Sequence, residues 1–123
     1  MELIPIQFWQ NDETGLIAVE VANKSTHKFK LGAIICNRRG KVVAHGYNDP
    51  RKGSTKWGSG KFMTLHAEGA ALMMASKLNI DVSGMTMYIF RENGNTSKPC
   101  PSCQALLHKA KIKKVYYSSK NGN

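Results

Sequence analysis

The chain has 123 residues, 41% of them hydrophobic, which is enough for one domain over residues 1–123 with a buried core and too little for two. Its 18 Lys and Arg residues against 8 Asp and Glu residues give a net charge of +10, which favours anionic, phosphate-bearing partners. No signal peptide opens the chain, no apolar run reaches membrane-spanning length, and the three cysteines are an odd number. We therefore expect a cytoplasmic protein with no membrane partner and no disulfide framework.

The first half of the chain predicts a helix followed by two strands. Apolar residues alternate with polar ones over residues 14–24 in a pattern that fits a short amphipathic helix. Residues 31–37 and 41–47 are rich in Ile and Val and predict a hairpin whose turn contains Gly40, a residue able to adopt positive φ. Residues 48–64 predict a long polar loop, a length usually found in binding or lid segments.

The second half predicts alternating helices and strands. A helix over residues 65–78 with Thr64 as its cap would carry Ala67, Ala70 and Ala71, small residues that permit close packing on a sheet. A strand over residues 85–91, a turn over 93–98, a helix from Pro101 to about residue 111 and a strand over 114–118 follow. Strand–helix–strand units of this kind pair in parallel, so we predict an α/β fold.

Residues that bind metals lie at the start of both of these helices. His66, Cys100 and Cys103 supply one imidazole and two thiolates, a set of three zinc ligands that leaves a fourth position for water. Glu68 lies two residues after the histidine, where a carboxylate that does not bind the metal can accept and return protons. His66 and Glu68 can serve one metal only if His66 lies at the very start of its helix.

This pattern, His66-Ala67-Glu68 followed by Pro99-Cys100-Pro101-Ser102-Cys103, resembles the cytidine and deoxycytidylate deaminase superfamily, and the likeness covers roughly residues 15–119. The resemblance implies a three-layer αβα sandwich with a mixed sheet and a zinc site at two helix N-termini. It implies Zn²⁺ as cofactor, Glu68 as catalytic residue, and substrate contacts from Asn48, Ala67 and Pro99.

The chain stops soon after residues 114–118, where this family usually adds a further strand and helix. If the last family strand is missing, residues 115–118 would form an unpaired sheet edge. Lysines flank this segment on both sides and would protect such an edge from misassembly.

Three functions remain open at this point. The leading one is zinc-dependent deamination of cytosine in a free nucleotide, deoxycytidylate or cytidylate, with ammonia released. The alternative is a cytosine or adenine deaminase that acts on RNA or single-stranded DNA, for which the +10 charge would suit a nucleic-acid partner. The third is a binding module with a relic zinc site. Asn48 has its own alternative as a turn residue that closes a strand, and we also expect a homo-oligomer.

Overall fold

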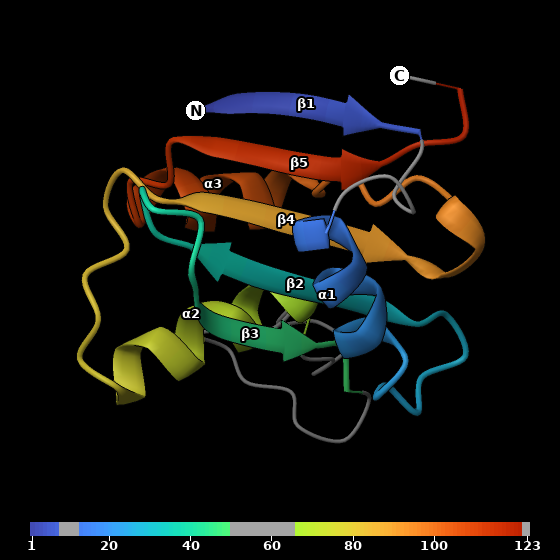
Figure 1. The fold of residues 1–123 in the computed structure, drawn as a ribbon, viewed down its shortest axis with the longest axis horizontal. Coiled ribbons are helices and arrows are strands. Elements are labelled where there is room, and N and C mark those ends of the chain that lie inside the picture. The colour runs from blue at the N-terminus through green and yellow to red at the C-terminus, as the bar shows by residue number, and fades with distance from the viewer. Residues whose placement is uncertain (8–12, 50–65, 122–123) are drawn as a thin grey trace.

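The computed structural model describes residues 1–7, 13–49 and 66–121. Within them, five strands form one sheet in the spatial order β1-β5-β4-β2-β3 (Figure 1). In chain order these strands are β1 (Glu2–Ile6), β2 (Leu31–Cys36), β3 (Val42–Tyr47), β4 (Thr86–Arg91) and β5 (Lys114–Ser118). The helices are α1 (Glu13–Ala22), α2 (Ala67–Lys77) and α3 (Pro101–Lys109), and a short 3₁₀-helix, η2 (Glu92–Gly94), follows β4.

The sheet is mixed, as predicted. β5 pairs in parallel with both β1 and β4, whereas β2 pairs antiparallel with β4 and β3. The helix α3 connects the parallel neighbours β4 and β5, because such strands need a crossover connection. Gly40 has a φ of +80° in the turn between β2 and β3, which confirms the predicted hairpin. The helices and strands predicted from residue 14 onward are all present, with ends that differ by one or two residues. The loop predicted over residues 48–64 lies outside the described residues except for its first two positions.

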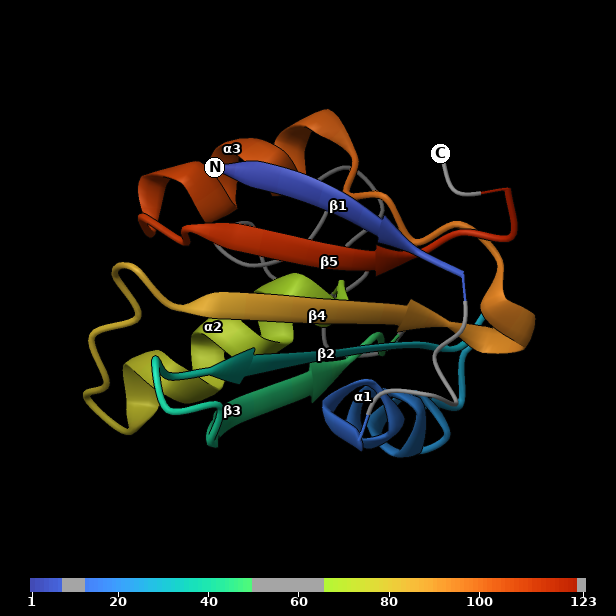
Figure 2. The same cartoon turned by 45° about the horizontal axis from the view of Figure 1, so that its top comes forward.

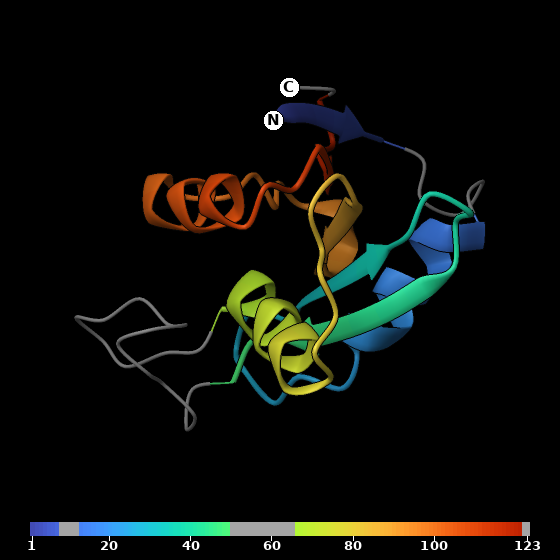
Figure 3. The ribbon, with the colours of Figure 1, turned by 90° about the vertical axis from the view of Figure 1, so that its left-hand side faces the viewer.

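Three layers result, because the helices cover opposite faces of the sheet. Figures 2 and 3 show α1 on one face and α2 with α3 on the other. Residues such as Ile35, Met87 and Leu107 form the larger core beneath α2 and α3. A smaller core, which includes Ala18 and Ile34, lies beneath α1. The alternation of Ile34 and Ile35 between the two cores is the period-2 pattern of a strand covered on both faces.

Two glycines allow the helices to lie unusually close to the sheet. A Cβ atom at Gly46 of β3 would lie 2.4 Å from the backbone nitrogen of Ala71 in α2, and one at Gly32 of β2 would lie 2.3 Å from that of Ala22 in α1. No side chain fits at these distances, so glycine is required where the backbones meet. The close packing predicted for the alanine-rich helix α2 is thereby confirmed.

The expectation that residues 115–118 form a sheet edge is wrong. β1 lies beside β5, with Leu3 opposite Val115, so β1 is the outer strand on this side. Pro5 of β1 lacks an N–H group, and an outer strand tolerates it because only one of its sides is hydrogen-bonded. The segment that forms β1 carries no clear strand signal in the sequence, because it is five residues long and contains this proline.

None of the helices in the described segments has both the length and the apolar composition needed to span a membrane. All three cysteines have free thiols, as expected from their number and spacing.

Candidate functional site

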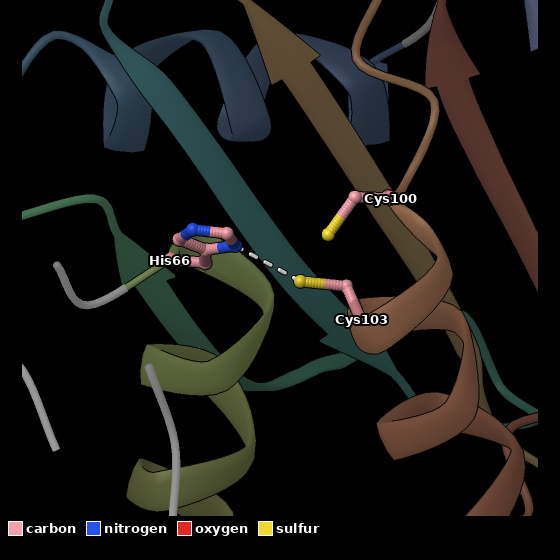
Figure 4. Close-up of side chains that lie close together, drawn as sticks. All are labelled: His66, Cys100 and Cys103. Atoms are coloured by element: carbon pink, nitrogen blue, oxygen red, sulfur yellow. Dashed lines mark hydrogen bonds between the residues drawn. The ribbon is translucent and has the colours of Figure 1, made fainter. Parts of the chain in front are cut away.

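The three expected metal ligands meet between the N-terminal ends of α2 and α3. His66, Cys100 and Cys103 offer ligand atoms that all lie within 4.8 Å of one another. His66 Nδ1 is 3.0 Å from Cys103 Sγ. Figure 4 shows the imidazole facing the two sulfurs across the space between the helices. One imidazole and two thiolates are a ligand set that zinc accepts while one coordination position stays open.

The backbone conformation at the two helix starts explains this meeting. His66 is the N-cap residue of α2 and Cys100 is the N-cap residue of α3, and both have extended backbones. Pro101 follows at the first helical position, where its missing N–H breaks no bond. The partial positive charge at each helix N-terminus favours thiolate over thiol.

The position of His66 corrects one detail of the sequence analysis. The helix begins at Ala67 and not at residue 65, so His66 itself holds the cap position that was assigned to Thr64, which lies outside the described residues. His66 does lie at the very start of its helix, as the sequence analysis required. With His66 at the extended cap, His66 and Glu68 both interact with Cys103, although they lie only two positions apart.

Two buried serines fix the segment that leads into α3. The Ser118 backbone N–H donates to Ser97 Oγ at 2.8 Å, and the Ser97 backbone N–H donates to the Ser118 carbonyl oxygen at 3.0 Å. Ser118 Oγ donates to the carbonyl oxygen of Asn95 at 2.6 Å and accepts from the backbone N–H of Arg91 at 3.0 Å. Ser118 is fully buried. These bonds tie the end of β4, the segment before the cysteines and the end of β5 into one unit.

The electrostatics of the cluster favour a cation. Burial raises the pKa of Glu68, which is 5% exposed, although hydrogen bonds and the nearby His66 oppose the rise. Burial also raises the pKa of Cys103, and the negative charges of Glu68 and Cys100 add to it. Burial opposes ionisation of Cys100, but hydrogen bonds with Ser102 and Cys103 hold the pKa of its thiol below the ordinary value.

Three groups that can carry negative charge therefore lie close together, and two of them, Glu68 and Cys103, are buried. A divalent cation would offset their mutual repulsion and satisfy both sulfurs, so these residues fit zinc. A carboxylate with a raised pKa holds a proton more readily than an ordinary one, which suits a group that takes up a proton and passes it on.

A cavity of about 330 Å³ lies beside the metal-ligand cluster. Glu68 lines it, as do His66 and two of the three residues expected to contact substrate, Asn48 and Ala67. Pro99 is not among the described residues that line the cavity. Its carbonyl oxygen accepts a hydrogen bond from Gln104 Nε2 at 2.8 Å, at the start of α3.

The side chain of Asn48 forms hydrogen bonds with other residues of the protein. Its Oδ1 accepts hydrogen bonds from Ser25 Oγ at 2.7 Å and from the backbone N–H of Leu31 at 2.9 Å, and its Nδ2 donates to the carbonyl oxygen of Phe29 at 2.5 Å. Asn48 therefore joins the end of β3 to the segment before β2. These bonds fit the alternative role of Asn48 as a turn residue that closes a strand. One N–H of the Asn48 side-chain amide has no partner among the described residues.

Among the described residues that line the cavity but were not predicted from the sequence are one aromatic and three basic or titratable side chains: Phe29, His27, Arg91 and Lys98. The Arg91 guanidinium lies 4.9 Å from the centre of the Phe29 ring. Its Nε is buried and has no hydrogen-bond partner among the described residues. No spacing signal links these residues, because only the pairing of β2 with β4 brings the start of one strand to the end of the other.

Comparison with known proteins agrees with this geometry. A family model, the cytidine and deoxycytidylate deaminase zinc-binding region, matches residues 10–119. The deoxycytidylate deaminase of Enterobacteria phage T4 is 29% identical over 102 residues, a match that covers 77% of this chain. The chain spans 46% of the length of that relative.

Solved structures of related proteins have the same fold. The dCMP deaminase of cyanophage S-TIM5 in its apo form has a TM-score of 0.66 and 28% sequence identity, with 87% of this chain and 81% of that chain covered. The same cyanophage protein in complex with dCMP and dUMP has a TM-score of 0.57 and 26% identity, with 89% and 76% covered. Cytidine deaminase from Burkholderia pseudomallei has a TM-score of 0.64 at 23% identity, with 86% and 82% covered, a likeness of fold alone.

Proposed function

Since this chain belongs to the cytidine and deoxycytidylate deaminase family, we propose that it hydrolyses cytosine in a free nucleotide, deoxycytidylate or cytidylate. Water and the cytosine base give a uracil base and ammonia. The observation that carries the proposal is the buried carboxylate of Glu68 in the same cavity as the ligands His66 and Cys100. A relic zinc module would not need a proton-accepting group in that place.

His66, Cys100 and Cys103 would hold the zinc ion. When bound, zinc supplies a Lewis acid that lowers the pKa of the attacking water. Glu68 accepts the proton of that water as the oxygen attacks the ring carbon bearing the amine. It then passes the proton to the ring nitrogen and assists the departure of ammonia.

The cations of the cavity support a phosphorylated substrate. Arg91 and Lys98 both line it, and Glu68 is the one carboxylate among the described lining residues. Arg91 Nε is buried and has no hydrogen-bond partner among the described residues, so it can donate to a phosphate oxygen. The cyanophage relative has been solved with dCMP and dUMP, two nucleoside monophosphates.

The proposal is tested by the release of ammonia from deoxycytidylate, cytidylate, cytidine and a single-stranded DNA oligomer. We expect turnover of a nucleoside monophosphate with a KM well below that for cytidine. Arg91→Gln should raise KM for the nucleotide about tenfold or more, the effect of losing one charge-assisted hydrogen bond, and leave KM for cytidine unchanged. Lys77→Gln, on an exposed part of α2, is the matched control.

Two other results would redirect the proposal. If only the single-stranded DNA oligomer is deaminated, and its rate of deamination falls steeply as salt increases, the result would favour a nucleic-acid deaminase. Full zinc occupancy without ammonia from any of the four substrates would favour a binding module. We also propose a homo-oligomer, which light scattering of the zinc-loaded chain would test.

A further inference from the structure

The part of the chain that the structure describes holds a second cavity, of about 370 Å³, away from the candidate active site. The strand β4 connects the two, because Arg91 at its end lines the first cavity, whereas Thr86 and Tyr88 near its start line the second. In Figure 1 the starts of β4 and β5 lie beside the end of β2, at the opposite end of the sheet from the tip of β4. The residues that define this far-end pocket are Arg38, Thr86, Tyr88, Lys113, Lys114 and Tyr116.

Cations dominate the charge of the far-end pocket. Arg38, Lys113 and Lys114 line it, and no Asp or Glu does so among the described residues. Glu2 lies opposite Lys114 in the register of β1 with β5, but it does not line the pocket. In the described part of the chain, no carboxylate forms an ion pair with any of the three cations. Three cations without a carboxylate among the described lining residues would attract an anionic ligand.

Hydrogen bonds hold the backbone on both segments that carry these cations. The Lys113 backbone N–H donates to the carbonyl oxygen of Met85 at 2.9 Å, and the Gly84 N–H donates to that of Lys111 at 2.8 Å. In the turn that carries Arg38, Asn37 Oδ1 accepts the backbone N–H groups of the two residues at positions 39 and 41, both at 3.0 Å. Donors held on a fixed backbone lose less entropy on binding than donors on a free loop.

Two tyrosines form a rigid wall of the pocket. The rings of Tyr88 and Tyr116 stack with their centres 4.8 Å apart and an angle of 20° between their planes. They lie opposite each other on β4 and β5, two register positions beyond the pair of Thr86 and Lys114, and therefore on the same face of the sheet. Aromatic and hydroxyl groups thus stand beside the cations, a mixture suited to a small organic anion and not to a bare metal ion.

We propose that the far-end pocket binds a small molecule that bears a phosphate or diphosphate group. Lysine and arginine donors favour phosphate oxygens, and the volume lies within the range of small-molecule sites. The pocket shares no described lining residue with the candidate active site, so its ligand need not be the substrate.

The test is a titration of the zinc-loaded, ¹⁵N-labelled full chain with inorganic pyrophosphate at constant ionic strength, followed by amide chemical shifts. We expect saturable shifts at Arg38, Gly84, Lys113 and Lys114 with a single dissociation constant. Arg38→Gln and Lys114→Gln should each weaken binding about tenfold, since each removes one charged donor. Lys77→Gln, an exposed lysine outside this pocket, should leave the dissociation constant unchanged.

A second arm of the titration separates two sources of the phosphate. If adenosine diphosphate binds more tightly than pyrophosphate with shifts at the same amides, the ligand carries an aromatic base as well as phosphate. If both bind equally, the phosphate group alone is recognised. Shifts confined to the candidate active site, shifts that do not saturate, or Arg38→Gln and Lys114→Gln variants that bind as the parent does would overturn the proposal.

Discussion

At the scale of single residues, the distinction between holding a metal and moving a proton can be tested directly. Glu68 is buried beside the metal ligands but is not one of the three grouped ligand residues. Glu68→Gln keeps the size and the hydrogen-bonding capacity of the side chain and removes its ability to take a proton. We expect the variant to keep one zinc per chain, measured by atomic emission, and to lose at least a hundredfold in kcat, the usual scale of general acid–base catalysis. A variant with parental kcat would rule out the proton-transfer role of Glu68.

The buried thiol of Cys103 should matter more to the metal than to the shape of the protein. Cys103→Ser replaces the sulfur that lies 3.0 Å from His66 Nδ1 with a poor zinc ligand of similar size. We expect zinc content to fall well below one ion per chain while the circular dichroism spectrum stays that of the parent. Cys36→Ser is the control, because this thiol lies in β2, outside the metal-ligand group, and should leave zinc content unchanged.

At the scale of elements, the hydrogen bonds of Ser118 link the last strand to the segment before the cysteines. Ser118→Ala removes the hydroxyl that bridges Asn95 and Arg91 and leaves buried partners unsatisfied. We expect the free energy of unfolding to fall by about 1–3 kcal/mol, and the affinity for zinc to fall as well because the chain before α3 loosens. Urea titration and competition with a chelator measure the two effects.

Two comparisons decide whether Ser118 positions the metal site. Ser76→Ala, an exposed serine of α2, is the matched control and should change neither quantity. Ser118→Thr keeps the hydroxyl and should recover zinc affinity more than stability, since its extra methyl group lies in a packed site. Loss of stability in Ser118→Ala with unchanged zinc affinity would make Ser118 a structural residue only.

At the scale of the whole molecule, β1 pairs with β5, which would otherwise be the outer strand on its side of the sheet. Its register with β5 places Leu3 opposite Val115, a fully buried core residue. Removal of residues 2–6 should expose β5 as an unpaired edge, lower the melting temperature and promote aggregation, measured by calorimetry and light scattering. Leu3→Ala should lower the melting temperature less, without aggregation. A truncated chain as stable and as monodisperse as the parent would show that β1 is dispensable.

A bound zinc ion should link α2 to α3, because its candidate ligands lie at the N-terminal ends of both helices. A chelator should therefore lower the melting temperature of the zinc-loaded protein by mass action. The same chelator should have no effect on Cys103→Ser, which serves as the internal control. If the chelator leaves the melting temperature of the parent protein unchanged, metal binding by His66, Cys100 and Cys103 does not stabilise the fold.

Residue types, spacing and periodicity along the chain were enough to predict the helices and strands from residue 14 onward and a candidate metal-ligand set. Strands and helices follow from local periodicity and from turn residues such as Gly40, and the ligands follow from the residue types that zinc accepts. The three-dimensional arrangement was needed to show that β1 pairs with β5, that Arg91 and Phe29 line the same cavity as Glu68, and that Tyr88 stacks on Tyr116. These contacts join segments distant in the chain, and strand pairing leaves no periodic mark in the sequence of either partner. Helices, strands and turns can be predicted from residues that are near one another in the sequence, whereas the order of strands in the sheet depends on how all the elements pack together.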